Sequence, residues 1–178
     1  MKKAKIVIAA LLLVIVSACN STPSLQEYYV ANSENPNFMT LDLPVGLLNI
    51  QQAKLSKEEK ESIGTLKKLN VLAFKKTDTN NADFLKEQTI IKSILKNKDF
   101  TELMKMNTDF GKATIKYLGN EDAIDEVVIY GDNEEKGFLV VRVLGNNMNP
   151  AKMIQFVQTL EKSEVNGSEL SKVLDFMK

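Results

Sequence analysis

The chain has 178 residues, and its 23 basic and 23 acidic side chains give a formal net charge of zero. It contains no histidine and no tryptophan, and Arg142 is its single arginine. Nucleic-acid-binding domains usually carry a basic excess that is rich in arginine, so this composition argues against a nucleic-acid partner. The lack of histidine removes the commonest general base and the commonest metal ligand.

The N-terminal stretch predicts a signal peptide that ends before Cys19. Lysines at positions 2, 3 and 5 precede an apolar run at 6–16. A transmembrane helix needs about 20 apolar residues, so this run is too short to span a bilayer. The stretch Val16-Ser17-Ala18-Cys19 resembles the bacterial lipobox, in which the cysteine is acylated and the chain is cut just before it. We therefore expect residues 1–18 to be a lipoprotein signal peptide; the alternative is an ordinary secretory signal.

Acylation of Cys19 would anchor the mature chain in a membrane of the cell envelope. Each buried acyl CH₂ contributes about 0.8 kcal/mol, and two or three chains give stable anchoring. Cys19 is the only cysteine, so its acylation leaves no disulfide, thiolate metal site or cysteine nucleophile. No aspartate directly follows Asn20, which by resemblance to known sorting signals favours the outer membrane, facing the periplasm.

Residues 19–36 predict a polar tether between the lipid and a single domain at 37–178. The segment is rich in Ser, Thr and Asn, a composition typical of linkers. Tyr28 and Tyr29 interrupt it, so its second half could instead dock on the domain.

The first half of the domain predicts alternating strands and helices. Residues 38–43 alternate polar and apolar side chains, as in a half-buried strand that Pro44 ends. Ser56 and Glu59 form a capping box that starts a helix reaching about Leu69. The predicted elements are a strand at 38–43, a short helix at 45–52, a helix at 56–69, a strand at 70–74 and a helix at 81–96.

The second half predicts an antiparallel meander followed by two helices. Strands are expected at 100–106, 112–118, 124–130 and 138–144, joined by loops of hairpin length. Helix is the rival interpretation for the first of them. Asn149 and Pro150 predict a helix start, and Ser168 could cap a last helix. This order is that of an α+β two-layer sandwich, a mainly antiparallel sheet with helices on one face.

The strand at 138–144 divides its side chains between two faces of the predicted sheet. We expect Leu139, Val141 and Val143 under the helices, so that their neighbours lie on an open face. Two tyrosines join those neighbours if the register allows it. The resulting patch, a candidate partner-binding site, comprises Tyr117, Tyr130, Phe138, Val140 and Arg142. The alternative is that the patch is covered, either by the segment around Tyr28 or by a second copy of the chain.

Two groups of carboxylates define the alternative of a hydrolase. Two acids held across a cleft can hydrolyse glycosides, but these fall in hairpin loops, where acidic side chains are usually only solvated. The groups are Glu121, Asp122, Asp125 and Glu126, and Asp132, Glu134 and Glu135. The second group does not match the EF-hand spacing, and no glycine-rich phosphate loop occurs. Ser93 and Lys96 have the spacing of a Ser-Lys dyad but lie late in a helix. We therefore expect no cofactor, no metal and no catalytic site.

Two short motifs connect the chain with a known family. Glu102-Leu103-Met104 opens the meander, and Val140-Val141-Arg142-Val143-Leu144-Gly145 closes it. Together with the lipobox and the β-α-β-α order, they resemble a family of short envelope lipoproteins and secreted proteins of Bacteroidota, which is catalogued only as a domain of unknown function. The resemblance covers about residues 37–165 and implies no catalytic residues.

These features predict a lipid-anchored binding module without a catalytic site. We expect it to contact a protein or a small amphipathic ligand through the open sheet face, or to associate with itself. An accessory or sensor lipoprotein in envelope stress signalling is the first alternative, and a hydrolase that uses the hairpin carboxylates is the second.

Overall fold

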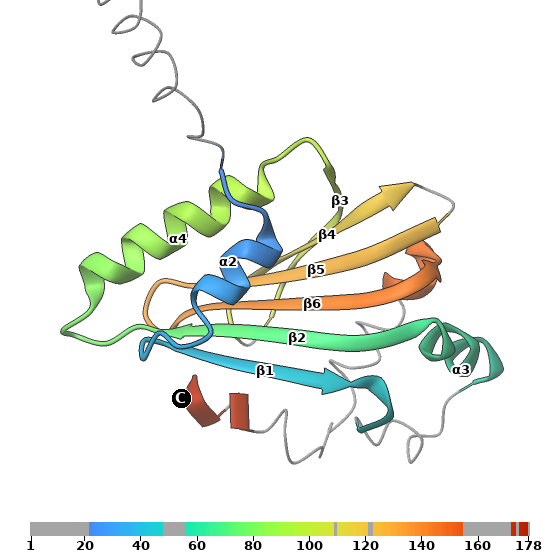
Figure 1. Ribbon diagram of the computed structural model, residues 1–178, viewed down its shortest axis with the longest axis horizontal. Helices are drawn as coiled ribbons and strands as arrows, with labels where there is room; N and C mark the ends of the chain where they lie inside the picture. Colours follow the sequence, from blue (N-terminus) through green and yellow to red (C-terminus); the bar gives the residue numbers. More distant parts are fainter. Residues whose placement is uncertain are drawn as a thin grey trace, which may run out of the picture.

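Six antiparallel strands form one sheet in the computed structural model, which describes residues 22–47, 56–108, 110–120, 123–154, 172–173 and 175–177. The strand order across the sheet is β1-β2-β6-β5-β4-β3 (Figure 1). The strands are β1 Phe38–Pro44, β2 Leu66–Lys75, β3 Phe100–Asn107, β4 Lys112–Asn120, β5 Ala123–Asn133 and β6 Gly137–Met148. The predicted α+β class with a mainly antiparallel sheet is confirmed.

Two helices lie across one face of this sheet (Figure 1). The first is α2, Leu25–Ala31, and the second is α4, Asn81–Leu95. The short helix α3, Lys57–Gly64, and the 3₁₀ turn η1, Val45–Leu47, lie in the connection from β1 to β2. No helix in the described part of the chain is long and apolar enough to cross a membrane.

Aromatic side chains pack the face that α2 and α4 cover. Phe38, Phe74 and Phe138 are cross-strand neighbours on β1, β2 and β6. The rings of Phe74 and Phe138 stack with their centroids 5.5 Å apart, and Phe84 of α4 packs against both. Burying such a side chain contributes about 1.5–3 kcal/mol, so this row fixes α4 on the sheet.

The opposite face of the sheet is also covered in part. Val71 and Ala73 of β2 are fully buried there, in a cluster with Val173 and Met177 from the C-terminal residues. Because β2 is covered on both faces, residues 69–74 are all buried.

Several predicted boundaries move in the structure. The helix predicted at 56–69 ends at Gly64, because Leu66 already pairs with Gly145 as the start of β2. The strand interpretation of the segment that begins at Phe100 is confirmed by β3. Asn149 accepts a hydrogen bond from the backbone N–H of Lys152, as expected of a helix cap. The predicted cap at Ser168 lies outside the described residues.

The segment predicted as a tether is in part a helix of the domain. Ser24 and Glu27 form a reciprocal capping box at the start of α2. Leu25, Tyr28 and Tyr29 are buried in the cluster that holds α4. The second half of the segment therefore docks on the sheet, and the tether expectation now applies only to residues 19–24. The predicted signal peptide and Cys19 lie outside the described residues.

Candidate functional site

An ion pair is buried where α2 crosses the sheet. Arg142 of β6 donates to the carboxylate of Glu126 on β5 through Nε and Nη2, both at 2.8 Å. Nη1 of Arg142 donates to the side-chain oxygen of Gln26 on α2. The side chains of Arg142 and Glu126 are only 6% and 9% exposed. Bidentate, charge-assisted hydrogen bonds are among the stronger polar contacts in proteins, so this guanidinium is committed to holding the fold.

The face that we expected to be open is the covered one. Tyr130, Phe138 and Val140 lie beneath α2 and α4, in the same cluster as Tyr28 and Tyr29. The prediction of an open patch around Arg142 was therefore wrong, and the alternative that the segment around Tyr28 covers it is confirmed. Alternation along β6 grouped Phe138, Val140 and Arg142 correctly, but it does not tell which face of a sheet receives the helices.

Tyr117 is separated from the other patch residues by the sheet. It pairs with Val127 of β5 and lies in the cluster of Val143, on the face opposite to Tyr130. Leu139 and Val141, which we expected under the helices with Val143, are on this second face too. The register therefore divides the two tyrosines instead of joining them.

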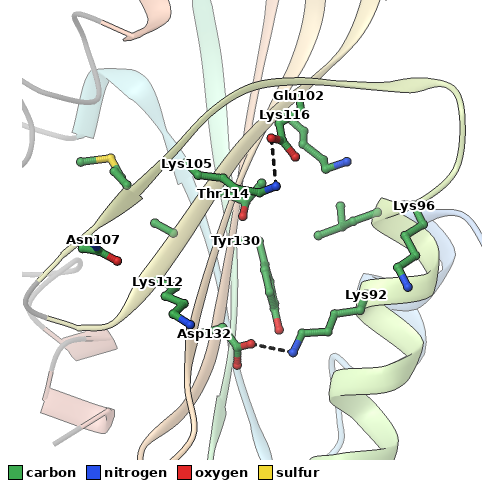
Figure 2. A pocket seen from close by; sticks show the side chains of 13 residues that line it. Lys92, Lys96, Glu102, Lys105, Asn107, Lys112, Thr114, Lys116, Tyr130 and Asp132 are labelled. Carbon is green, nitrogen blue, oxygen red and sulfur yellow. Dashed lines mark ion pairs between the residues drawn. The ribbon is translucent and has the colours of Figure 1, made fainter.

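A groove opens beside α4, where the sheet extends past the helices. It has a volume of about 510 Å³ and lies between α4 and the strands β3, β4 and β5 (Figure 2). Its lining consists of Lys92, Leu95, Lys96, Glu102, Lys105, Met106, Asn107, Lys112, Ala113, Thr114, Lys116, Tyr130 and Asp132. Five lysines against two carboxylates give this lining a formal charge of +3, so the groove is basic although the chain has a net charge of zero.

The groove continues the helix-covered face toward the free edge of the sheet. A cross-strand row runs from Lys105 of β3 through Thr114 of β4 and Tyr130 of β5 to Val140 of β6. Its members become less exposed along that order. Side chains of one strand alternate between faces, so Lys112 and Lys116 point to the same side as Thr114, and the basic face of β4 is the wall of the groove.

Two of the five lysines have acidic partners within the groove. Lys92 of α4 pairs with Asp132 of β5 at 2.7 Å, and the same carboxylate accepts a hydrogen bond from Gln88 at 2.8 Å. Lys105 pairs with Glu102 at 3.1 Å, both on β3. These pairs use both carboxylates of the lining.

Three lysines remain without an ion pair among the described residues. They are Lys96, the C-cap of α4, and Lys112 and Lys116 of β4. Figure 2 shows them placed around the groove, Lys96 on the helix side and the other two on the strand side. Their charge is therefore available to a bound molecule.

A buried hydroxyl group lies at the floor of the groove. Tyr130 is 6% exposed, and its Oη has no hydrogen-bond partner among the described residues. Figure 2 shows its ring directed from Thr114 toward the pair of Lys92 and Asp132. Burial raises the pKa of this phenol well above its usual range, and the negative charge and the nearby acceptor oxygens of the Asp132 carboxylate raise it further, so the hydroxyl remains protonated at neutral pH. The carboxylate itself is engaged by Lys92 and Gln88.

A second cavity of about 360 Å³ lies at the N-terminal end of α2. Its lining includes Gln26, Phe100, Glu126 and Arg142. Arg142 already donates to both Glu126 and Gln26, and the other charged side chains of this lining are the carboxylates of Glu27, which accepts from Ser24, and Asp99. The groove beside α4 is the better candidate for a binding site.

The carboxylates considered for a hydrolase have other roles where the structure describes them. Glu126 is held by Arg142, and Asp132 is held by Lys92. The exposed members are Asp125, Glu134 and Glu135, and Glu121 and Asp122 lie outside the described residues. Within the described part of the chain, no group of three or more His, Cys, Asp or Glu side chains could hold a metal ion.

Sequence reasoning did not find the groove. The available signals were the alternation of Lys112, Thr114 and Lys116 on a predicted strand and the spacing of Lys92 and Lys96, which puts both on one helix face. Each signal alone describes an ordinary solvated surface. Only the packing of α4 against β5, with β4 across the groove, brings the two sets together.

The comparisons with known proteins identify a family and no individual relative. No curated protein and no solved structure matches the chain. One family model, the Domain of unknown function (DUF4252), matches residues 28–156. The match begins inside α2, includes all six strands and contains both the groove and the Arg142–Glu126 pair. The resemblance to a domain of unknown function is thus confirmed, over a slightly earlier range than the expected 37–165. The chain belongs to the DUF4252 family.

Proposed function

We propose that this chain is a lipid-anchored, non-catalytic binding module of the bacterial cell envelope, whose ligand binds in the basic groove beside α4. The observation that carries the proposal is a cavity of about 510 Å³ with three lysines that no described residue neutralises. The ligand is therefore placed in the groove, which is the exposed continuation of the sheet face, and not in the patch that α2 covers. Pockets of this size, with apolar walls and a few convergent polar groups, are typical of ligand sites.

The anchor would hold the domain close to the membrane. Acylated Cys19 would precede α2, which begins at Leu25, and six extended residues reach about 20 Å. The lack of an aspartate directly after Asn20, by resemblance to known sorting signals, favours the outer membrane and its periplasmic side. Replacing Cys19 with alanine should move the chain from the membrane fraction to the soluble periplasmic fraction. Retention of the variant in membranes would contradict the anchor.

Photocrosslinking in cells tests the groove itself. A photoreactive amino acid at Thr114, in the groove, should give a discrete adduct. The same residue at Leu85, which is 51% exposed on α4 and does not line the groove, is the control. Equal adducts at both positions, or none at Thr114, would show that the groove is not the contact site.

The mass of the adduct separates the proposed module from the alternative of a sensor. A shift of less than about 1 kDa would identify a small ligand, whereas a shift of a whole polypeptide would identify a protein partner in a signalling assembly. Both results place the contact in the groove, and they assign different classes of partner to it.

A further inference from the structure

We propose that the groove binds a phosphate group, with Lys96, Lys112 and Lys116 supplying its counter-charge and the hydroxyls of Thr114 and Tyr130 donating hydrogen bonds. This inference rests on the proposed function and names the chemistry of its ligand. It follows from three observations: the unpaired charge, the kind of cation that carries it, and the unpartnered hydroxyl.

The unpaired charge indicates an anion. Lys96, Lys112 and Lys116 come from two elements that face each other across the groove, and both carboxylates of the lining are already paired. Leu95, at the end of α4, adds an apolar side chain to the helix side of the groove. Low-dielectric walls beside charges of one sign focus the potential and raise the local concentration of the opposite ion.

The kind of cation favours phosphate over carboxylate. A planar carboxylate is best matched by the two-pronged fork of an arginine, whereas lysine binds phosphate as a point charge. The only arginine of the chain is committed to Glu126 and Gln26. A phosphate monoester carries about −1.5 to −2 charges at neutral pH and has three strong acceptor oxygens, which suits three separate ammonium groups better than one carboxylate would.

The unpartnered hydroxyl supplies a directed donor. Tyr130 Oη is buried at the floor of the groove. Its nearby acceptor is the carboxylate of Asp132, but the hydroxyl makes no hydrogen bond of regular geometry within the described part of the chain. A buried polar group without a partner is costly, and native structures contain few of them. A phosphate oxygen that reached the floor of the groove would accept a hydrogen bond from this hydroxyl. Thr114 of β4 is the cross-strand neighbour of Tyr130, so its hydroxyl would be the second donor.

The test is calorimetric titration of the purified full chain, in non-ionic detergent at 150 mM salt, with inorganic phosphate and with octyl phosphate. The triple variant Lys96→Ala, Lys112→Ala, Lys116→Ala should weaken the binding of octyl phosphate by about tenfold or more. The matched control, Lys57→Ala, Lys60→Ala, Lys67→Ala, removes the same charge from exposed lysines of α3 and β2 that do not line the groove. It should leave the affinity within about twofold. Tyr130→Phe should weaken binding by about two- to fivefold through the loss of one donor.

Each outcome decides a separate point. A clear gain in affinity from the octyl chain assigns the phosphate to a lipid-like ligand, whereas equal affinity for both probes assigns it to a soluble phosphate compound. Absence of binding by the unmodified chain, or equal loss in both triple variants, overturns the phosphate site. If that happens while the crosslink at Thr114 persists, the proposed function stands and only the ligand class is wrong.

Discussion

Arg142 and Lys116 lie in one cross-strand row and yet have different surroundings. Lys116 of β4 pairs with Val128 of β5, which in turn pairs with Arg142 of β6. At the inner end of the row, Gln26 of α2 and the carboxylate of Glu126 use all three nitrogens of the guanidinium. At the outer end, the ammonium group of Lys116 lines a groove and has no ion pair among the described residues.

The difference shows that the position of the helices decides whether a cation on this sheet is paired within the protein or left free to bind a ligand. Under α2, a cation must be matched by protein groups, because an unpaired buried charge is costly. Past the edge of α4, water or a ligand can solvate it, and the chain leaves it unmatched. We therefore regard the covered end of the face as structural and the uncovered end as the place for binding.

The largest expected effect comes from opening the covered end. Arg142→Met would leave the Glu126 carboxylate buried without its partner, and the free energy of unfolding should fall by about 3–5 kcal/mol. Lys116→Met removes a cation from the same row and should change it by no more than about 0.5 kcal/mol. Urea unfolding followed by circular dichroism measures both. Similar losses in the two variants would mean that the two ends of the row do not differ.

The double variant Arg142→Met, Glu126→Leu sharpens this result. Replacing both members of a buried ion pair with apolar residues is often neutral or stabilising. Much of the stability lost in the single variant should therefore return. If it does not return, Arg142 stabilises the fold by more than neutralising Glu126, for instance by holding Gln26 and hence α2.

The next effect concerns the hydroxyl of Tyr28, which has a hydrogen-bond partner within the helix layer. It donates to Glu87 of α4 at 2.9 Å, and hydrogen bonds to charged groups contribute about 1.5–3 kcal/mol. Tyr28→Phe should therefore lower the free energy of unfolding by about 1.5–2 kcal/mol at pH 7. Unchanged stability at that pH would show that the bond to Glu87 contributes nothing.

The contribution of Tyr28 to the free energy of unfolding also depends on pH in the alkaline range. Burial, and then the hydrogen bond and charge of Glu87, raise the pKa of its phenol well above the ordinary value near 10. Its contribution is therefore fully present below pH 10 and is lost as the pH rises further, by about 1.4 kcal/mol per pH unit. In unfolding curves recorded from pH 9 to 11, Tyr28→Phe should flatten this decline.

A smaller effect is expected at the start of α2. Ser24→Ala removes the capping hydroxyl and should cost about 1 kcal/mol, with hydrogen exchange in α2 accelerated and Gln26 loosened from Arg142. Ser93→Ala, an exposed serine on α4, should change stability by no more than about 0.5 kcal/mol. Equal exchange rates in the two variants would argue against the cap.

The contribution of the same cap to stability should decrease at acidic pH. Ser24 donates its backbone N–H to Glu27 and holds the pKa of that carboxyl below its usual range. The contribution is therefore present above the unfolded-state pKa and is lost as the pH falls through the lower, folded-state value. Glu27→Gln should make the stability of α2 insensitive to pH in this interval.

The sequence predicted the class of the fold, the meander and the alternation of side chains along each strand, because alternation is a local property. It could not predict the register that separates Tyr117 from Tyr130, or which face is covered. The covered face is set by α2, whose buried side chains are Leu25, Tyr28 and Tyr29. Three such residues within a polar segment are too weak a pattern to predict a helix. The groove was missed for the same reason, since its lysines come from α4, β3 and β4 and meet only in the folded chain.

The smallest effect should be that of Tyr130→Phe, and its size tests whether the groove is really open. A buried hydroxyl without a partner costs free energy, so removing it should leave stability at pH 7 unchanged or raise it by up to about 1 kcal/mol. Its pKa is raised chiefly by burial, so the alkaline decline should flatten as it does for Tyr28→Phe. A loss above about 1 kcal/mol at pH 7 would reveal a partner for the hydroxyl inside the protein, and the floor of the groove would then belong to the structural end of the sheet face.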